Sequence, residues 1–284
     1  MLNHPAEPWP DRPPYRPFLG GPPRFAVGAA PIPKSVWLRG NPEAAANAEN
    51  RAAVLAARPG DAVKWDTASL PAQAEALAMI AGHLGGPAPP SDAADIVRAG
   101  ALTSDDLVIM EKRAGVWRAT ALILTAPTFF VPSEAFGADL AALHKPVPGA
   151  APSLTSIGLA GRIGALFDRT PADQVLQRFN WTLQCGTERW APSGSVLRAR
   201  AAEMRSELCA AALHLRVERQ TIRHLPETGA VLFTIRVCLD PVSALAPELL
   251  ATLANAWRGA DEAARRYKAW DPLDEAAQLA FARS

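Results

Sequence analysis

Two β-type runs joined by a turn signal constrain the fold of this chain more than any other feature of its sequence. Residues 213–225 and 230–239 are rich in branched and aliphatic side chains, and the residues between them, 226–229, are Pro-Glu-Thr-Gly. A connection this short joins neighbouring strands only in antiparallel order, because parallel strands need a crossover of about a dozen residues or more. Two further runs within 107–124, separated by Arg-Ala-Gly, predict a second hairpin of the same kind.

The remaining segments predict one more long strand and helices before, between and after the strands. Alternation of apolar and polar residues over 179–185 indicates a half-buried strand, and 129–131 is a short β-type run. Ser133 is a natural N-cap for an amphipathic helix that must end before Pro146. Further helices are expected over 41–58, 71–83, 157–167, 199–212, 242–257 and 261–270. The fold class is therefore α+β, an antiparallel sheet with surrounding helices.

The N-terminal segment differs from the rest in composition. Residues 1–33 contain ten of the 27 prolines, and proline lacks a backbone N–H and fixes φ, so this segment cannot form a helix or a central strand. We expect an arm that runs extended over the surface, with a proline-rich ligand of an SH3-type domain as the alternative. A length of 284 residues allows one large domain or two smaller ones. We expect a single domain over 34–284.

Charge and hydropathy exclude several classes of partner. The chain has 29 Lys and Arg against 28 Asp and Glu, a net charge of +1, which provides no electrostatic footprint for nucleic acid or an anionic membrane. The longest apolar stretch, 119–131, is shorter than the roughly 20 residues that span a bilayer. Nothing at the N-terminus has the pattern of a signal peptide, so we expect a cytoplasmic protein.

Common catalytic motifs are missing from the sequence. It contains no P-loop, no GxGxxG dinucleotide fingerprint, no HExxH zinc motif and no GxSxG nucleophile elbow. The three cysteines, Cys185, Cys209 and Cys238, are too widely spaced for a CxxC zinc site and too few for an iron–sulfur cluster, which needs four thiolates. Electrons for any redox chemistry must therefore arrive from another protein.

One candidate site residue is His144, at the predicted exit of the amphipathic helix before Pro146. Its place at a helix C-terminus, where the dipole is negative, favours the charged ring, and the proline segment behind it fixes the direction of the side chain. An imidazole nitrogen is a ligand for haem iron or a metal ion. A histidine that only caps the helix is the alternative.

The other candidates lie on predicted strands. Arg178 and Asn180 share the polar face of one strand, and Arg216, Glu218 and Gln220 share one face of the next. Arg219 interrupts the opposite, apolar face, and a buried arginine needs partners, since unpaired donors cost about 1–3 kcal/mol. A solvated face or a structural ladder of ion pairs explains these patterns equally well.

The sequence segments that contain these candidates, taken in their order along the chain, resemble the haem-dependent oxidative N-demethylases, the family of the dimethylamine monooxygenase haem subunit. The resemblance rests on residues 142–149, 178–181 and 215–221, the last leading into 225–226 and 231–236, and it extends from about Arg24 to Trp270. It implies a PAS-like fold that binds haem b, so that 34–284 forms one haem-binding PAS-like domain.

The resemblance also implies a reaction and its partners. The reaction is O2-dependent removal of a methyl group from a small secondary amine such as dimethylamine, which yields a primary amine and formaldehyde. The electrons come from a reductase whose separate subunits carry FMN and a [2Fe–2S] cluster. Two alternatives without turnover remain open: a haem-binding sensor or carrier, and a haem-free protein that binds amines.

Carried over residue by residue, the resemblance assigns roles to the candidates. His144 is expected to be the axial ligand of the haem iron, with its other ring nitrogen on a backbone carbonyl, and a cysteinate from Cys185 or Cys238 is the alternative. Glu218 is expected to hold the substrate ammonium. Arg178 and Arg219 are expected to pair with haem propionates, with Glu218 or with iron-bound oxygen. The remaining residues expected to contact the cofactor are Pro146, Asn180, Arg216 and Gln220.

Overall fold

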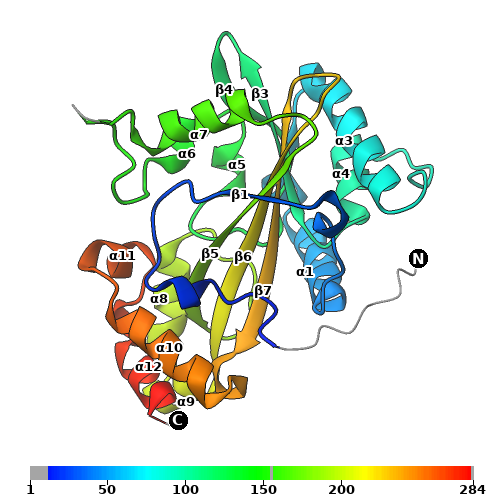
Figure 1. Ribbon diagram of the computed structural model, residues 1–284. Coiled ribbons are helices and arrows are strands. Elements are labelled where there is room, and N and C mark those ends of the chain that lie inside the picture. Colours follow the sequence, from blue (N-terminus) through cyan, green and yellow to red (C-terminus); the bar gives the residue numbers. More distant parts are fainter. Residues whose placement is uncertain (1–11, 154–155, 283–284) are drawn as a thin grey trace.

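A single antiparallel sheet organises the molecule. The computed structural model describes residues 12–153 and 156–282, and its seven strands pair in the order β1-β5-β6-β7-β3-β4-β2, each with an antiparallel neighbour. Figure 1 shows the long strands running through the centre of the molecule with helices on both sides. The strands are β1 (Ala30–Ile32), β2 (Val63–Trp65), β3 (Asp106–Arg113), β4 (Val116–Ile123), β5 (Val175–Cys185), β6 (Leu213–His224) and β7 (Val231–Pro241).

Both predicted hairpins are confirmed, and with them the α+β class. β6 and β7 pair along their full length, and the carboxylate of Glu75 accepts the backbone N–H groups of Glu227 and Thr228 at the turn between them, at 2.8 and 2.9 Å. β3 and β4 join through Ala114 and Gly115, which have φ angles of +49° and +80°. Two consecutive left-handed residues form the turn whose twist matches that of the strands it connects.

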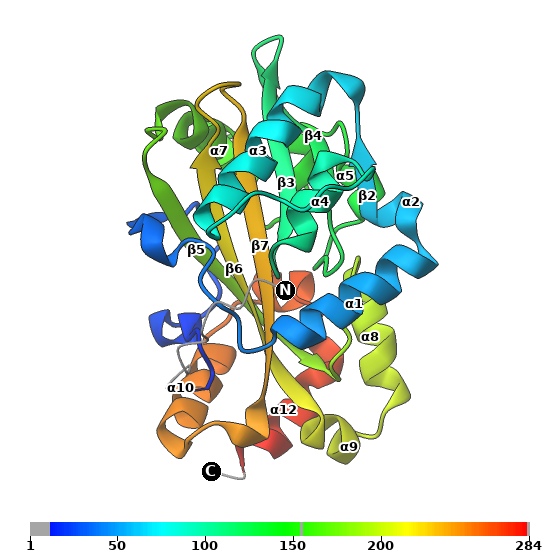
Figure 2. The same cartoon turned by 90° about the vertical axis from the view of Figure 1, so that its right-hand side faces the viewer.

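The helices cover both faces of the sheet, and their positions agree in part with the sequence pattern. They are α1 (Ala44–Ala57), α2 (Pro59–Ala62), α3 (Leu70–His83), α4 (Asp95–Ala101), α5 (Pro132–Ala135), α6 (Leu140–His144), α7 (Gly158–Arg169), α8 (Gly194–Glu203), α9 (Ser206–Ala211), α10 (Pro247–Arg258), α11 (Glu262–Tyr267) and α12 (Asp274–Phe281). Five short 3-10 helices cover Pro17–Gly20, Lys34–Val36, Thr67–Ser69, Val242–Ala244 and Asp271–Leu273. Helices α1, α3 and α4 lie towards the viewer in Figure 2, on the side away from α6 and α7 in Figure 1.

The alternation of side chains along β3 divides the core between the two faces. Leu107 and Ile109 pack with α3 and α4, whereas Val108 and Met110 pack with α6 and α7 on the other side. A third cluster, at the far ends of β5 and β6, packs against α9, α10 and α12. We refer to the side covered by α6 and α7 as the cavity face and to the other as the opposite face.

Two predictions between β4 and α7 are wrong. Residues 129–131 form no strand but a bend, in which Phe129 has a φ of +64°. The helix expected from Ser133 is broken into α5 and α6, because Gly137 adopts a left-handed φ of +76° between them. Asp139 is the cap of the second piece, and its side chain accepts the N–H of Ala142 at 2.8 Å.

Other helix boundaries also differ from the prediction. The helix expected over 199–212 is divided into α8 and α9, because Met204 has an extended backbone. The helix expected from Val242 starts only at Pro247, after a short 3-10 turn. Helices α4 and α12 were not expected.

The described part of the N-terminal arm lies against the domain. Arg12 pairs with Glu43 and Asp240 at 2.6 and 2.9 Å, and Phe18 is fully buried against the sheet and α10. Residues 1–11 of the predicted arm lie outside the described residues. In Figure 1 the dark-blue segment passes α10 and α11 before it reaches β1. Among the helices of the described residues, none has the length and apolar character needed to cross a membrane.

Candidate functional site

The cavity face contains a pocket between the sheet, α6, α7 and α11. It has a volume of about 210 Å³, is partly open to solvent, and has mostly apolar walls that include Phe129, Phe130 and Phe233. Segments 24–27 and 128–130 complete the walls. The polar side chains that line it come from Arg24, Thr128, His144, Arg178, Asn180, Glu218, Gln220 and Tyr267.

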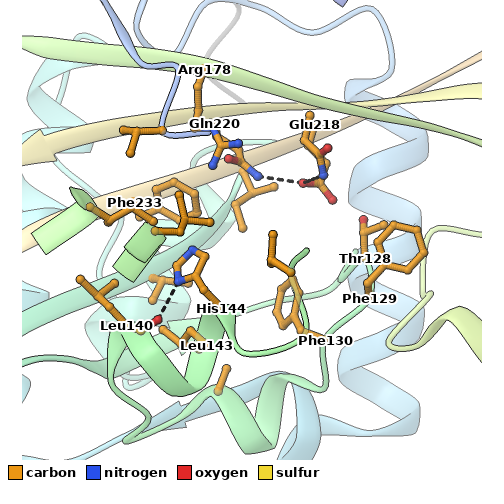
Figure 3. A pocket seen from close by; sticks show the side chains of 18 of the residues that line it. Thr128, Phe129, Phe130, Leu140, Leu143, His144, Arg178, Glu218, Gln220 and Phe233 are labelled. Atoms are coloured by element: carbon orange, nitrogen blue, oxygen red, sulfur yellow. Dashed lines mark hydrogen bonds between the residues drawn. The ribbon is translucent and has the colours of Figure 1, made fainter. Parts of the chain in front are cut away.

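Strand register brings four of the predicted residues together. Arg178 pairs with Gln220, and Asn180 pairs with Glu218 across β5 and β6. Side chains two residues apart on a strand point to the same face, so the four form a polar patch on the cavity face. Figure 3 shows Arg178, Gln220 and Glu218 on one side of the cavity and His144 with Leu140 on the other.

The carboxylate of Glu218 is buried and held by two amides. Gln220 Nε2 donates to Glu218 Oε2 at 2.8 Å, and Asn180 Nδ2 donates to the same oxygen at 3.3 Å. No hydrogen bond from the described residues reaches Oε1. One carboxylate oxygen is therefore fixed by the protein, and the other can accept a hydrogen bond from a ligand.

Two buried polar atoms of the patch have no partner among the described residues. They are Arg178 Nε and Gln220 Oε1. Burial lowers the pKa of Arg178, while the negative charge of Glu218 opposes this shift. Native proteins leave few buried polar atoms unpaired, so two such atoms facing one cavity are typical of a ligand-binding site.

His144 presents one ring nitrogen to the cavity. It is the last residue of α6, and its Nδ1 lies 2.8 Å from the carbonyl oxygen of Leu140 one turn earlier. Burial lowers the pKa of His144 below its ordinary value of 6.5, and the charge of Arg178 acts in the same direction. The ring is therefore neutral at pH 7, with a proton on Nδ1 for Leu140 and a lone pair on Nε2, and this is the form that binds iron.

Lys268 belongs to this region and is absent from the residues predicted for the site. It follows α11 and is fully buried. Its Nζ donates to Asn180 Oδ1 at 2.6 Å. Burial lowers its pKa to about 7. The sequence feature that could have predicted its burial is the helical period, because Lys268 is four residues after the buried Ala264 and eleven after the buried Trp257.

Arg219 is not part of the site. Its guanidinium is on the opposite face, where it donates to the carbonyl oxygens of Trp37 at 2.6 Å and Val36 at 2.8 Å and to Gln177 Oε1 at 2.6 Å. The alternation along β6 separates it from Glu218, and none of its contacts is with the cavity.

Arg216 shares the face of Glu218 but does not line the cavity. It is fully buried, and its donors go to Thr128 Oγ1, Gln184 Oε1 and the carbonyl oxygens of Ala126, Pro127 and Arg189. Burial lowers its pKa to about 10, so it stays charged at neutral pH. Arg216 thus fixes the segment before Phe129 and places a positive charge beside Glu218.

The two cysteines considered as alternative ligands lie outside the cavity. Cys185 Sγ contacts Met204 Sδ at 3.1 Å in the cluster beneath α9, and Cys238 is buried near Asn41. Pro146, in contrast, lines the cavity next to His144. The described residues contain no group of three or more His, Cys, Asp or Glu side chains that could hold a bare metal ion. A haem iron needs only an axial ligand from the protein.

A family of proteins matches most of the chain that builds this site. The model of the family described as haem-dependent oxidative N-demethylase, alpha subunit-like, matches residues 86–278, well over half of the 284 residues. The matched part includes His144, Arg178, Glu218 and Lys268. No curated protein shows significant similarity to the chain.

Proposed function

The chain belongs to the haem-dependent oxidative N-demethylase, alpha subunit-like, family, and from this premise we propose that it binds haem b and demethylates a small secondary amine such as dimethylamine. The products are a primary amine and formaldehyde. The observation that carries the proposal is a neutral imidazole, His144, placed across an apolar cavity from a single buried carboxylate, Glu218.

The residues of the cavity suit a haem. Its aromatic and aliphatic walls would accept the apolar macrocycle. His144 Nε2 would hold the haem iron, and Pro146, which also lines the cavity, would support the segment behind it. The unpartnered Nε of Arg178 offers a charged donor to a haem propionate. When bound and reduced, the haem supplies the activation of O2.

Glu218 holds the substrate. A secondary amine is cationic at neutral pH, and an ammonium without a partner is too costly to bury. Oε1 of Glu218 accepts one N–H of the ammonium, while Asn180 and Gln220 keep Oε2 in place. Phe129 and Phe130 exclude water from the methyl groups of the amine. The carboxylate can also receive the proton that the amine gives up as it reacts.

Electrons reach the haem from partner subunits that carry FMN and a [2Fe–2S] cluster. The three cysteines of this chain are free and buried, and a cluster needs four thiolates. We also propose that residues 34–284 are one PAS-like haem-binding domain. The described part of the arm, 12–33, contributes to its pocket, because Phe25 lines the cavity.

The test combines haem content, amine binding and turnover. Purified protein is expected to show a haem absorption band that shifts with dimethylamine, and to release formaldehyde when a flavin and iron–sulfur reductase and NADPH are added. His144→Ala is expected to lose haem or change its ligand field by electron paramagnetic resonance, whereas His214→Ala, outside the cavity, is not. A haem absorption band that does not shift when amine is added favours a haem-binding sensor or carrier. Purified protein that takes up no haem contradicts the proposal.

A further inference from the structure

Lys268 is a buried cation next to the proposed amine site. Its ammonium is connected to the carboxylate through one side chain, since Lys268 Nζ donates to Asn180 Oδ1 and Asn180 Nδ2 donates to Glu218 Oε2. The donor on Nζ determines which end of the Asn180 amide faces Glu218. Without it, the amide could rotate and place its oxygen against the carboxylate.

Aromatic rings enclose this ammonium and also line the cavity. Lys268 Nζ lies 5.5 Å from the ring centre of Phe129, 5.8 Å from Tyr267 and 5.9 Å from Phe25. Cations are attracted to such rings at these distances. All three rings are walls of the cavity, so an organic ammonium bound at Glu218 would share both its carboxylate and its aromatic surroundings with Lys268.

The charges around Lys268 leave one carboxylate for several cations. Glu218 favours the protonated lysine, whereas Arg178 on β5 and Arg216 on β6 disfavour it. Tyr267, next in sequence, is neutral at working pH because burial raises its pKa to about 12. Arg24 and His144 are the other titratable side chains among the described residues that line the cavity. An added cation at Glu218 increases the positive charge around this carboxylate and so favours the loss of charge from one of the cations already there.

We propose that Lys268 is a positioning residue of the amine site: it orients Asn180 toward Glu218, and in its charged form it competes with the substrate ammonium for that carboxylate. The inference rests on the proposed function, which places the amine at Glu218. The arginines stay charged, and burial brings the pKa of Lys268 to about 7, so Lys268 is the cation that responds. Amine binding then releases a proton from Lys268 Nζ to the buffer.

Linkage gives the sign of the pH dependence. Below about pH 7 the lysine is charged and must lose its proton before the amine binds, so affinity falls about tenfold per pH unit at most. Above about pH 8 the lysine is already neutral and affinity levels off. Between pH 6 and pH 8 we expect affinity to rise about tenfold.

The experiment is calorimetric titration of the haem-loaded protein with dimethylamine hydrochloride at pH 6, 7 and 8, in two buffers of different ionisation enthalpy. Wild type is expected to release protons on binding at pH 7, and its affinity for dimethylamine is expected to rise about tenfold from pH 6 to pH 8. Lys268→Met is expected to bind without proton release and with a flat pH profile. Lys268→Arg is expected to bind more weakly at every pH, because its charge cannot be lost. Lys112→Met, whose ammonium pairs with Asp168 on the surface, is the control and keeps the wild-type profile.

The outcomes separate this inference from the proposed function. Proton release and a pH slope that survive in Lys268→Met assign the proton to another group and overturn the inference, while the proposed function stands. Wild-type binding with no proton release overturns it as well, even if neither variant folds. A wild type that binds no dimethylamine at any pH overturns the proposed function and this inference with it.

Discussion

Both faces of the sheet at β5, β6 and β7 bury charged side chains, but the surroundings of these side chains differ between the two faces. On the opposite face Arg236 pairs with Asp105 at 2.6 Å and with two carbonyl oxygens, and Arg219 binds two carbonyl oxygens and an amide. On the cavity face Arg178 Nε and Gln220 Oε1 have no partner among the described residues, and both residues line the pocket. Arg223 Nε and Asp240 Oδ2 on the opposite face also lack a partner among the described residues, but neither residue lines that pocket. Buried charge that the protein itself satisfies is structural, whereas buried charge left unpaired beside a cavity belongs to a ligand.

The largest effect is expected when a satisfied pair is broken. Arg236→Met leaves the fully buried Asp105 with only a hydroxyl partner, Thr234, and is expected to cost about 3–5 kcal/mol of unfolding free energy. Arg178→Met on the cavity face is the matched variant and is expected to change stability by less than about 1 kcal/mol. Urea denaturation measures both. Equal losses of unfolding free energy in the two variants would contradict the difference between the two faces.

Removing the carboxylate of the cavity face should affect binding and leave folding intact. Glu218→Gln keeps the size of the side chain and is expected to weaken dimethylamine binding by about 1.5–3 kcal/mol, or ten- to a hundredfold, with unchanged haem content. The haem absorption shift on titration with amine measures it.

The control for this variant is Glu75→Gln. That carboxylate accepts the backbone N–H groups at the turn between β6 and β7, so its loss lowers stability and leaves amine affinity at the wild-type value. Identical titrations of wild type and Glu218→Gln would assign this carboxylate to a structural network with its neighbours and place the substrate elsewhere.

Neighbouring residues on one strand sharpen the comparison further. Thr221 Oγ1 accepts Trp37 Nε1 at 3.0 Å on the opposite face, so Thr221→Val strands a buried donor and is expected to cost about 1–2 kcal/mol. Gln220→Met on the cavity face removes Oε1, which has no partner among the described residues, together with the Nε2 donor to Glu218 Oε2. Because Asn180 Nδ2 still donates to that oxygen, this variant is expected to cost less than Thr221→Val. Thermal denaturation without added amine compares them, and a larger loss in Gln220→Met would contradict the assignment of the faces.

The smallest effect is expected for a partly exposed ion pair near the turn between β3 and β4. Arg113 donates to Asp66 at 2.5 and 2.9 Å, and this hydrogen bond lowers the pKa of Asp66. A lowered carboxyl pKa gives stability that is present above the unfolded-state pKa and is lost as the pH falls through the folded-state value. Because about a third of each side chain is exposed, Asp66→Asn should cost less than about 1 kcal/mol at pH 7. The difference from wild type should vanish in acid or high salt.

Periodicity predicts the strands and the polar patch for one physical reason. A period of two fixes which side chains share a face, so the alternation along each strand is enough to pair Arg178 with Asn180 and Glu218 with Gln220, and to separate Arg219 from them. The bend at Phe129 could not be predicted, because it depends on a backbone contact with Ala191 and on Arg216, both distant in sequence.

The part of the site that the sequence does not predict is the part built by distant segments of the chain. Lys268 follows two arginines and a tyrosine in sequence and has the composition of a solvated helix end. Its burial results from packing among Phe25, Phe129 and Asn180, which come from three other places in the chain. The local pattern contains only the faint helical register with Ala264.

The edge-to-face contact between Phe25 and Tyr267, with ring centres 5.4 Å apart, has a consequence for biosynthesis. Phe25 and Tyr267 are 242 residues apart in sequence, and the Arg12–Asp240 pair likewise spans 228 residues. Domains form from the N-terminus during translation, and a contact this remote forms only after the segment that holds its later partner has been made. The wall that these rings form therefore closes late in the folding of the domain, so a cofactor enters a chain that is already largely folded.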